Sequence, residues 1–115
     1  MGNYVEIKNS NIGNFARINH MAFIGDAEIH EQVTIGAGVI TCNHDGIDIH
    51  KTLIKKGAYI GSNSNLVAPI VIEENSTIGS GSTITSDTLG NKLTLARSRQ
   101  VTIEDWKKNK GRKED

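Results

Sequence analysis

Aliphatic residues recur at every sixth position along much of the chain. The longest run is Ile54, Ile60, Leu66, Ile72, Ile78 and Ile84. The same spacing occurs earlier in Ile12, Ile18 and Ile24, and it resumes after a one-residue shift in Ile29 and Ile35. Neither the 3.6-residue period of a helix nor the two-residue period of a strand produces such a pattern. A strict period of six is typical of the hexapeptide parallel β-helix, in which each hexad supplies a short strand and a turn.

The hexad phase also predicts what each position does. Three hexads form one triangular coil, the aliphatic residue points inward, and successive coils bury a continuous column. Four positions further along each hexad, mostly small residues are expected near the corners: Ala58, Ser64, Ile70, Ser76 and Ser82. We therefore expect an all-β, left-handed parallel β-helix of about four coils. Its first coils are expected to be missing, so that the open end belongs to a longer protein or is covered by something else.

Two segments depart from the repeat. Residues 41–53 lose the hexad and are expected to project as a loop, a common place for binding groups in solenoids. The repeat then stops at about Leu89. This predicts a hexapeptide domain over residues 1–88 and an arm with a basic tail over residues 89–115. Thr102 is an N-cap candidate with Asp105 at the capping-box spacing, so a short helix is expected from Thr102 to Lys110.

Composition supports this architecture and excludes several functions. Ile, Val and Thr make up 31 of the 115 residues, whereas only five residues are aromatic, so the core is small and oligomerisation is expected. The formal net charge is zero, which argues against nucleic acid as a partner. No long apolar run or signal-peptide segment is present, which predicts no membrane span and a cytoplasmic protein. The basic tail is either a solvated end or a phosphate-attracting rim.

The loop between the repeats gathers several groups that can bind metal ions. Cys42, His44, Asp45 and His50 lie within nine residues of one another. Their spacing matches no closed zinc pattern, so no metal site is expected. A single cysteine also excludes an intramolecular disulfide framework.

Several longer motifs resemble one enzyme family. They are Gly25-Asp26-Ala27-Glu28-Ile29, Ile35-Gly36-Ala37-Gly38, Thr41-Cys42-Asn43-His44-Asp45-Gly46, Leu66-Val67-Ala68-Pro69 and Leu95-Ala96-Arg97-Ser98-Arg99-Gln100. Together they resemble the bacterial bifunctional N-acetylglucosamine-1-phosphate uridylyltransferase/glucosamine-1-phosphate acetyltransferase. The resemblance runs from Gly2 to about Trp106 and covers only the C-terminal part of the acetyltransferase domain. The uridylyltransferase domain, to which the family's magnesium belongs, is absent from the chain.

The resemblance implies a reaction and a set of residues. The family transfers an acetyl group from acetyl-CoA to the amino group of glucosamine 1-phosphate, a step toward UDP-N-acetylglucosamine. His20 stands where the family has its general base. The positions that match sugar-phosphate ligands are Lys8, Phe23 in place of a Tyr, and Thr34 in place of an Asn. The positions that match the acetyl-CoA site are Ala37, Asn43, His44 in place of a Tyr, Ser62, Ser80 in place of an Ala, and Arg97.

The chemistry of the expected reaction fits these residue types. A neutral imidazole can take the proton that the sugar amine must lose, and no covalent enzyme intermediate is needed. Main-chain N–H groups of Gly36, Ala37 and Gly38 are candidate donors to the developing oxyanion. The family forms homotrimers with acetyltransferase sites between subunits, so the same assembly is expected here. Two alternatives stay open: a free-standing acyltransferase for another amino sugar, or a catalytically silent trimeric scaffold.

Overall fold

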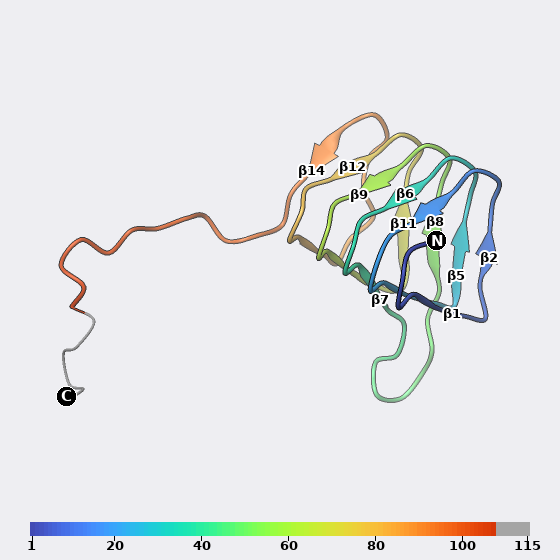
Figure 1. Ribbon diagram of the computed structural model, residues 1–115, viewed down its shortest axis with the longest axis horizontal. Helices are drawn as coiled ribbons and strands as arrows, with labels where there is room; N and C mark the ends of the chain where they lie inside the picture. Colours follow the sequence, from blue (N-terminus) through green and yellow to red (C-terminus); the bar gives the residue numbers. More distant parts are fainter. Residues whose placement is uncertain (108–115) are drawn as a thin grey trace.

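The computed structural model describes residues 1–107 and shows a triangular prism of short stacked strands, from one end of which an arm extends (Figure 1). Every strand is two or three residues long. In chain order the strands are β1 (Glu6–Lys8), β2 (Asn11–Ile12), β3 (Arg17–Ile18), β4 (Phe23–Gly25), β5 (Ala27–Ile29), β6 (Thr34–Ile35), β7 (Ile40–Cys42), β8 (Thr52–Ile54), β9 (Tyr59–Ile60), β10 (Asn65–Val67), β11 (Ile70–Ile72), β12 (Thr77–Ile78), β13 (Thr83–Ile84) and β14 (Leu93–Thr94). No helix in this part of the chain is long and apolar enough to cross a membrane.

Three parallel sheets form the faces of the prism. The first face has the order β1-β4-β7-β10-β13, the second β11-β8-β5-β2 and the third β14-β12-β9-β6-β3. Each strand pairs with the strand one coil away, as in the register of Ile18 with Ile35 and of Ile35 with Ile60. The expected left-handed parallel β-helix is therefore confirmed, and its stack is four to five strands deep.

The aliphatic hexad positions form most of the core, and their predicted inward orientation is confirmed from Ile18 onward, whereas Ile12 is 37% exposed. Side chains with at most 1% exposure in this column are Ile18, Ile24, Ile29, Ile35, Ile54, Ile60, Leu66, Ile72 and Ile78. The small corner residues are buried too, and the serine hydroxyls among them are hydrogen-bonded. Ser64 and Ser82 both donate to the Gly79 carbonyl, over 3.2 and 2.7 Å. Because burying a large aliphatic side chain contributes about 1.5–3 kcal/mol, this column is the main source of stability.

Thr41 corrects the predicted extent of the projecting loop. β7 ends at Cys42 and β8 begins at Thr52, so the loop spans residues 43–51 rather than 41–53. Thr41 occupies an aliphatic slot, in register with Leu66, and is 1% exposed. Its hydroxyl accepts the Gly25 N–H at 2.8 Å and donates to the Gly25 carbonyl at 3.2 Å. A buried hydroxyl with such partners replaces the missing hydrocarbon, and a pattern of apolar residues does not reveal it.

The end of the chain differs from the expectation in two ways. The repeat does not stop at Leu89, because Leu93 and Thr94 of β14 pair with Thr77 and Ile78. The helix expected from residue 102 is wrong over residues 102–107, which form no helix and are exposed; residues 108–110 lie outside the described part. Nothing packs against residues 102–107, and a capping-box spacing alone does not stabilise so short a helix in water.

Candidate functional site

Four of the residues expected in the site lie in one row along the edge between the third and first faces. Main-chain bonds join successive coils there: Gly38 N–H to the His20 carbonyl at 2.9 Å, and Asn63 N–H to the Ala37 carbonyl at 2.8 Å. A third bond joins Gly81 N–H to the Ser62 carbonyl at 2.8 Å. We call His20, Ala37, Ser62 and Ser80 the edge row. Successive residues of the row, which are 17 to 25 positions apart in the chain, thus lie one coil apart because the helix repeats.

Glycines beside the edge row allow the coils to approach closely. A Cβ at Gly36 would lie 2.7 Å from the Ser62 nitrogen, and one at Gly61 would lie 2.5 Å from the Ser80 nitrogen. Both distances are far below van der Waals contact between main-chain and side-chain atoms. The glycines that follow the aliphatic residue in these hexads therefore bring the edge row together.

The His20 side chain is exposed at the end of this row, and its ring is held by the main chain. Asn3 donates its N–H to His20 Nδ1 at 2.9 Å. A ring nitrogen that accepts a hydrogen bond carries no proton, so in this conformation the neutral ring carries its proton on Nε2. An open cavity of 340 Å³ adjoins the ring and is lined by Gly2, Arg17 and Asn19 among others.

The three candidate oxyanion donors are not equivalent. Gly36 N–H donates to the Ile60 carbonyl at 2.8 Å, and Gly38 N–H donates to the His20 carbonyl at 2.9 Å. The hypothesis that either glycine N–H faces substrate is therefore wrong for this conformation, because the coil-to-coil ladder already uses it. The Ala37 N–H makes no main-chain hydrogen bond within residues 1–107.

The residues expected to bind the sugar phosphate lie at two different edges of the prism. Phe23 on β4 and Thr34 on β6 are both half-buried, and they flank the edge row on the first and third faces. Lys8 ends β1 in register with Gly25, at the opposite edge of the first face. Within the described part of one chain, no hydrogen bond or ion pair connects Lys8 with Phe23, Thr34 or His20.

Asn43 belongs to a polar ladder at that opposite edge. Asn43 Nδ2 donates to Asp26 Oδ2, and Asn9 Nδ2 donates to Asp26 Oδ1, each at 2.6 Å. The hydrogen bond from Asn9, followed by that from Asn43, lowers the pKa of Asp26 below its ordinary value of 3.8, against the opposing effect of burial. The ladder fixes the point at which the loop leaves the prism.

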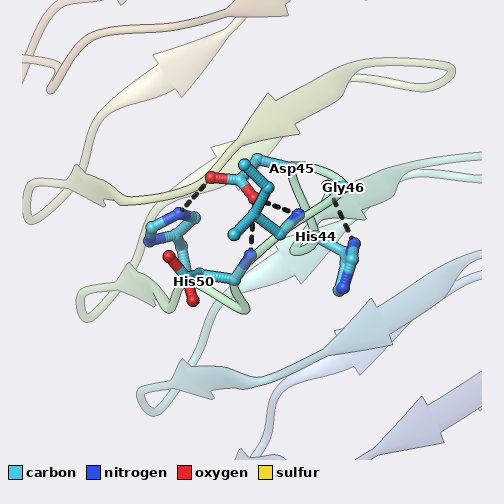
Figure 2. Close-up of polar contacts among 6 residues, drawn as sticks. His44, Asp45, Gly46 and His50 are labelled. Atoms are coloured by element: carbon cyan, nitrogen blue, oxygen red, sulfur yellow. Dashed lines mark hydrogen bonds and ion pairs between the residues drawn. The ribbon is translucent and has the colours of Figure 1, made fainter.

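His44 lies in the loop of residues 43–51, which projects from the prism between β7 and β8 (Figure 1). Figure 2 shows that Asp45 lies at the centre of this loop. Asp45 Oδ2 lies 2.8 Å from His50 Nε2, and its Oδ1 accepts the N–H groups of Ile47 and Asp48 at 2.8 and 2.7 Å. His44 Nδ1 accepts the Gly46 N–H at 2.9 Å. In this conformation both carboxylate oxygens of Asp45 and Nε2 of His50 are therefore engaged within the loop.

Arg97 reaches back to the edge row from the arm. Its Nη1 donates to the Ser80 carbonyl at 2.6 Å. The structure thus joins Arg97 with Ser80, whereas Asn43 and His44 form a separate group. Sequence reasoning missed the Asn3 main chain, which carries no side-chain pattern, and the pairing of Asp45 with His50.

Other polar features lie away from these groups. A larger cavity of 510 Å³ follows the edge between the second and third faces, where Glu28, His30 and Lys56 line it. None of the expected site residues lines it, so its size does not identify it as the site. Within residues 1–107, no cluster of three or more His, Cys, Asp and Glu side chains is placed to hold a metal ion.

In sequence, the chain is similar to hexapeptide-repeat transferases and to the C-terminal part of bifunctional GlmU proteins. Residues 51–86 match the family described as Bacterial transferase hexapeptide (six repeats). Bifunctional protein GlmU of Methylococcus capsulatus is 52% identical over 115 residues, which are 99% of this chain and 25% of that protein. Bifunctional protein GlmU of Thermosipho africanus is 54% identical over 106 residues, which are 92% of this chain and 24% of that protein. The chain spans about a quarter of the length of these relatives.

Solved structures with low sequence identity share the fold. A hexapeptide-repeat acetyltransferase of Vibrio cholerae, solved with acetyl coenzyme A, superposes with a TM-score of 0.69 at 16% identity, covering 88% of this chain and 71% of that one. A maltose O-acetyltransferase of Clostridium difficile superposes with a TM-score of 0.68 at 20% identity, covering 81% of this chain and 62% of that one.

Proposed function

We propose that this chain, a hexapeptide-repeat β-helix whose resemblance to bifunctional GlmU proteins is confirmed over 99% of its length, transfers an acetyl group from acetyl-CoA to the amino group of glucosamine 1-phosphate. The observation that carries the proposal is the edge row. Residues expected from separate motifs as base and coenzyme ligands lie one coil apart on a single edge. We place the reaction in the cytoplasm, where acetyl-CoA is the available donor.

His20 is the residue to which we assign proton transfer. The neutral amine attacks the thioester carbonyl carbon, and His20 takes the proton that the nitrogen loses. The tetrahedral intermediate then collapses, the carbon–sulfur bond breaks, and the imidazolium returns the proton to the leaving thiolate. For this role the unprotonated ring nitrogen must face the amine. The bond from Asn3 to Nδ1 is the interaction that such a turn of the ring has to break.

The remaining edge-row residues support coenzyme binding. Ala37 offers an N–H that the coil ladder does not use, and this group is the one we assign to the oxyanion. Ser62 and Ser80 continue the row, and Arg97 supplies a cation beside Ser80 for the phosphates of the coenzyme. Asn43 and His44 are assigned to the same ligand from the projecting loop.

The separation of the two residue groups supports a trimeric site. Lys8, Asn43 and His44 lie at one edge of the first face, whereas the edge row lies at its other edge. Packing three prisms around a threefold axis would bring one chain's loop to a neighbour's edge row. We propose that each acetyltransferase site in a homotrimer combines residues of neighbouring chains, with Lys8, Phe23 and Thr34 recognising the sugar phosphate.

A turnover assay tests the proposal. Acetyl-CoA and glucosamine 1-phosphate are incubated with the protein, and the release of free thiol is followed. We expect turnover by the wild type and a fall in kcat of about 10²–10⁴-fold for His20→Ala, the range expected for loss of a general base. His30→Ala, which changes a histidine on another edge, is expected to match the wild type.

The outcomes separate the parts of the proposal. A folded trimer without turnover would overturn the activity. Turnover retained by His20→Ala would overturn the assignment of the base alone. Faster turnover with glucosamine than with its 1-phosphate would overturn the proposed acceptor. Phe23 lacks the hydroxyl of the Tyr expected in the family, and Thr34 has a hydroxyl where an Asn would have an amide.

A further inference from the structure

The loop of residues 43–51 is closed at its base by the main chain. His50 N–H donates to the Asn43 carbonyl at 2.7 Å, and His44 and Ile49 form an antiparallel bridge. Asn43 is in turn held by Asp26 at 2.6 Å. The two residues that we assign to the coenzyme, Asn43 and His44, therefore lie at the base of a small hairpin.

The tip of the same hairpin depends on one carboxylate. Asp45 accepts two main-chain N–H groups with one oxygen and contacts His50 Nε2 with the other (Figure 2). Asp45 N–H also donates to the Asp48 carbonyl at 3.1 Å. Hydrogen bonds from the Asp48 main chain, from His50 and from the Ile47 main chain lower the pKa of Asp45 far below 3.8, so it is a carboxylate at neutral pH.

Apolar packing does not hold this loop. Its two aliphatic side chains, Ile47 and Ile49, are 85% and 60% exposed. A segment without buried apolar contacts opens at low free-energy cost unless polar contacts hold it. Asp45 lies on the first side of the hairpin tip, and its side chain contacts Ile47, Asp48 and His50, which follow later in the loop. These contacts therefore join the two sides of the tip.

The loop also sets the orientation of His44. Because Gly46 N–H donates to His44 Nδ1, the neutral ring carries its proton on Nε2, the nitrogen that this bond leaves free. Gly46 lies directly after Asp45, so the same turn that Asp45 holds also places the donor to His44.

We propose that Asp45 and His50 form a positioning pair that keeps the loop closed and thereby presents Asn43 and His44 to acetyl-CoA as a preformed surface. The inference rests on the proposed function and adds two residues that act through others rather than by touching the coenzyme. Preorganisation matters because a loop that is already ordered loses less conformational entropy on binding.

The test compares Asp45→Ala with Asp48→Ala. Both variants remove one carboxylate from the same exposed loop, but only the Asp45 side chain holds it. His50→Gln keeps a donor toward Asp45, whereas His50→Ala removes it. Hydrogen exchange of the Ile47, Asp48 and His50 amides measures loop order without any ligand, and calorimetric titration measures the Kd of acetyl-CoA.

We expect Asp45→Ala and His50→Ala to lose amide protection and to raise the Kd of acetyl-CoA about tenfold, whereas Asp48→Ala and His50→Gln stay near the wild type. We also expect the KM for the acceptor to stay unchanged, since the pair acts on the coenzyme side. Unchanged amide protection or unchanged acetyl-CoA affinity in Asp45→Ala would overturn the positioning pair alone. A wild type that binds no acetyl-CoA would overturn the proposed function and this inference with it.

Discussion

The prism and the projecting loop are held together by opposite kinds of interaction. In the prism, Ile24, Ile60 and Leu66 are fully buried and stack in columns of hydrocarbon. In the loop, Ile47 is 85% exposed, and order comes from hydrogen bonds centred on Asp45. Apolar burial gives the prism a rigid, repeating edge on which distant residues align. Polar contacts give the loop a defined shape without burying its aliphatic side chains. The prism and the loop can therefore be perturbed separately.

The largest difference in stability between the two regions is expected when one aliphatic residue in each is replaced by alanine. Ile60→Ala leaves a cavity in the column and is expected to lower the free energy of unfolding by about 2–5 kcal/mol. Ile47→Ala is expected to change it by less than about 0.5 kcal/mol, as for most exposed positions. Urea unfolding followed by circular dichroism gives both values. Equal losses in the two variants would show that the loop shares the apolar core.

Two buried threonines at the root of the loop sharpen the comparison. Thr41 has two hydrogen-bond partners on Gly25, whereas Thr52 Oγ1 is buried and has no partner within the described residues. Thr41→Val leaves the Gly25 N–H unpaired and is expected to cost about 1–3 kcal/mol, whereas Thr52→Val is expected to be neutral or slightly stabilising. The same denaturation experiment measures both variants. A larger cost for Thr52→Val than for Thr41→Val would contradict the hydrogen-bond assignments.

The smallest expected effect is a pH dependence at the ladder between Asn9, Asp26 and Asn43. Because the folded-state pKa of Asp26 is lowered, its contribution to stability is present above the unfolded value of about 3.8 and is lost as the pH falls through the folded value. The unfolding free energies of the wild type and of Asp26→Asn are therefore expected to differ at pH 6 and to converge below pH 3.8. A difference that is constant from pH 6 to the acid limit would contradict this assignment.

The hexad pattern alone predicts most of the prism, because each inward position is chemically constrained. It fails at Thr41, where a hydrogen-bonded hydroxyl replaces an aliphatic group in the same slot. It also fails at residues 102–107, where a capping spacing has no packed helix to cap. In both places the deciding interaction is tertiary, whereas the sequence displays only local preference.

The candidate site likewise has a part that the sequence predicts and a part that it does not. The motifs identify the residues of the edge row, and the repeat explains why they align. The pairing of Asp45 with His50 and the bond from Asn3 to His20 depend on loop and main-chain geometry, which no residue pattern encodes. Lys8 and Asn43 were assigned to one site with His20, but in a single chain they lie at a different edge.

The central claim is that the edge row and the loop bind the coenzyme, and a nuclear magnetic resonance titration with acetyl-CoA tests it most directly. Amide shifts of the ¹⁵N-labelled protein are followed residue by residue as acetyl-CoA is added. We expect the largest changes at Ala37, Ser62, Ser80 and the loop of residues 43–51. Changes centred instead on Glu28, His30 and Lys56, the edge with the larger cavity, would contradict the account, as would no change at any residue.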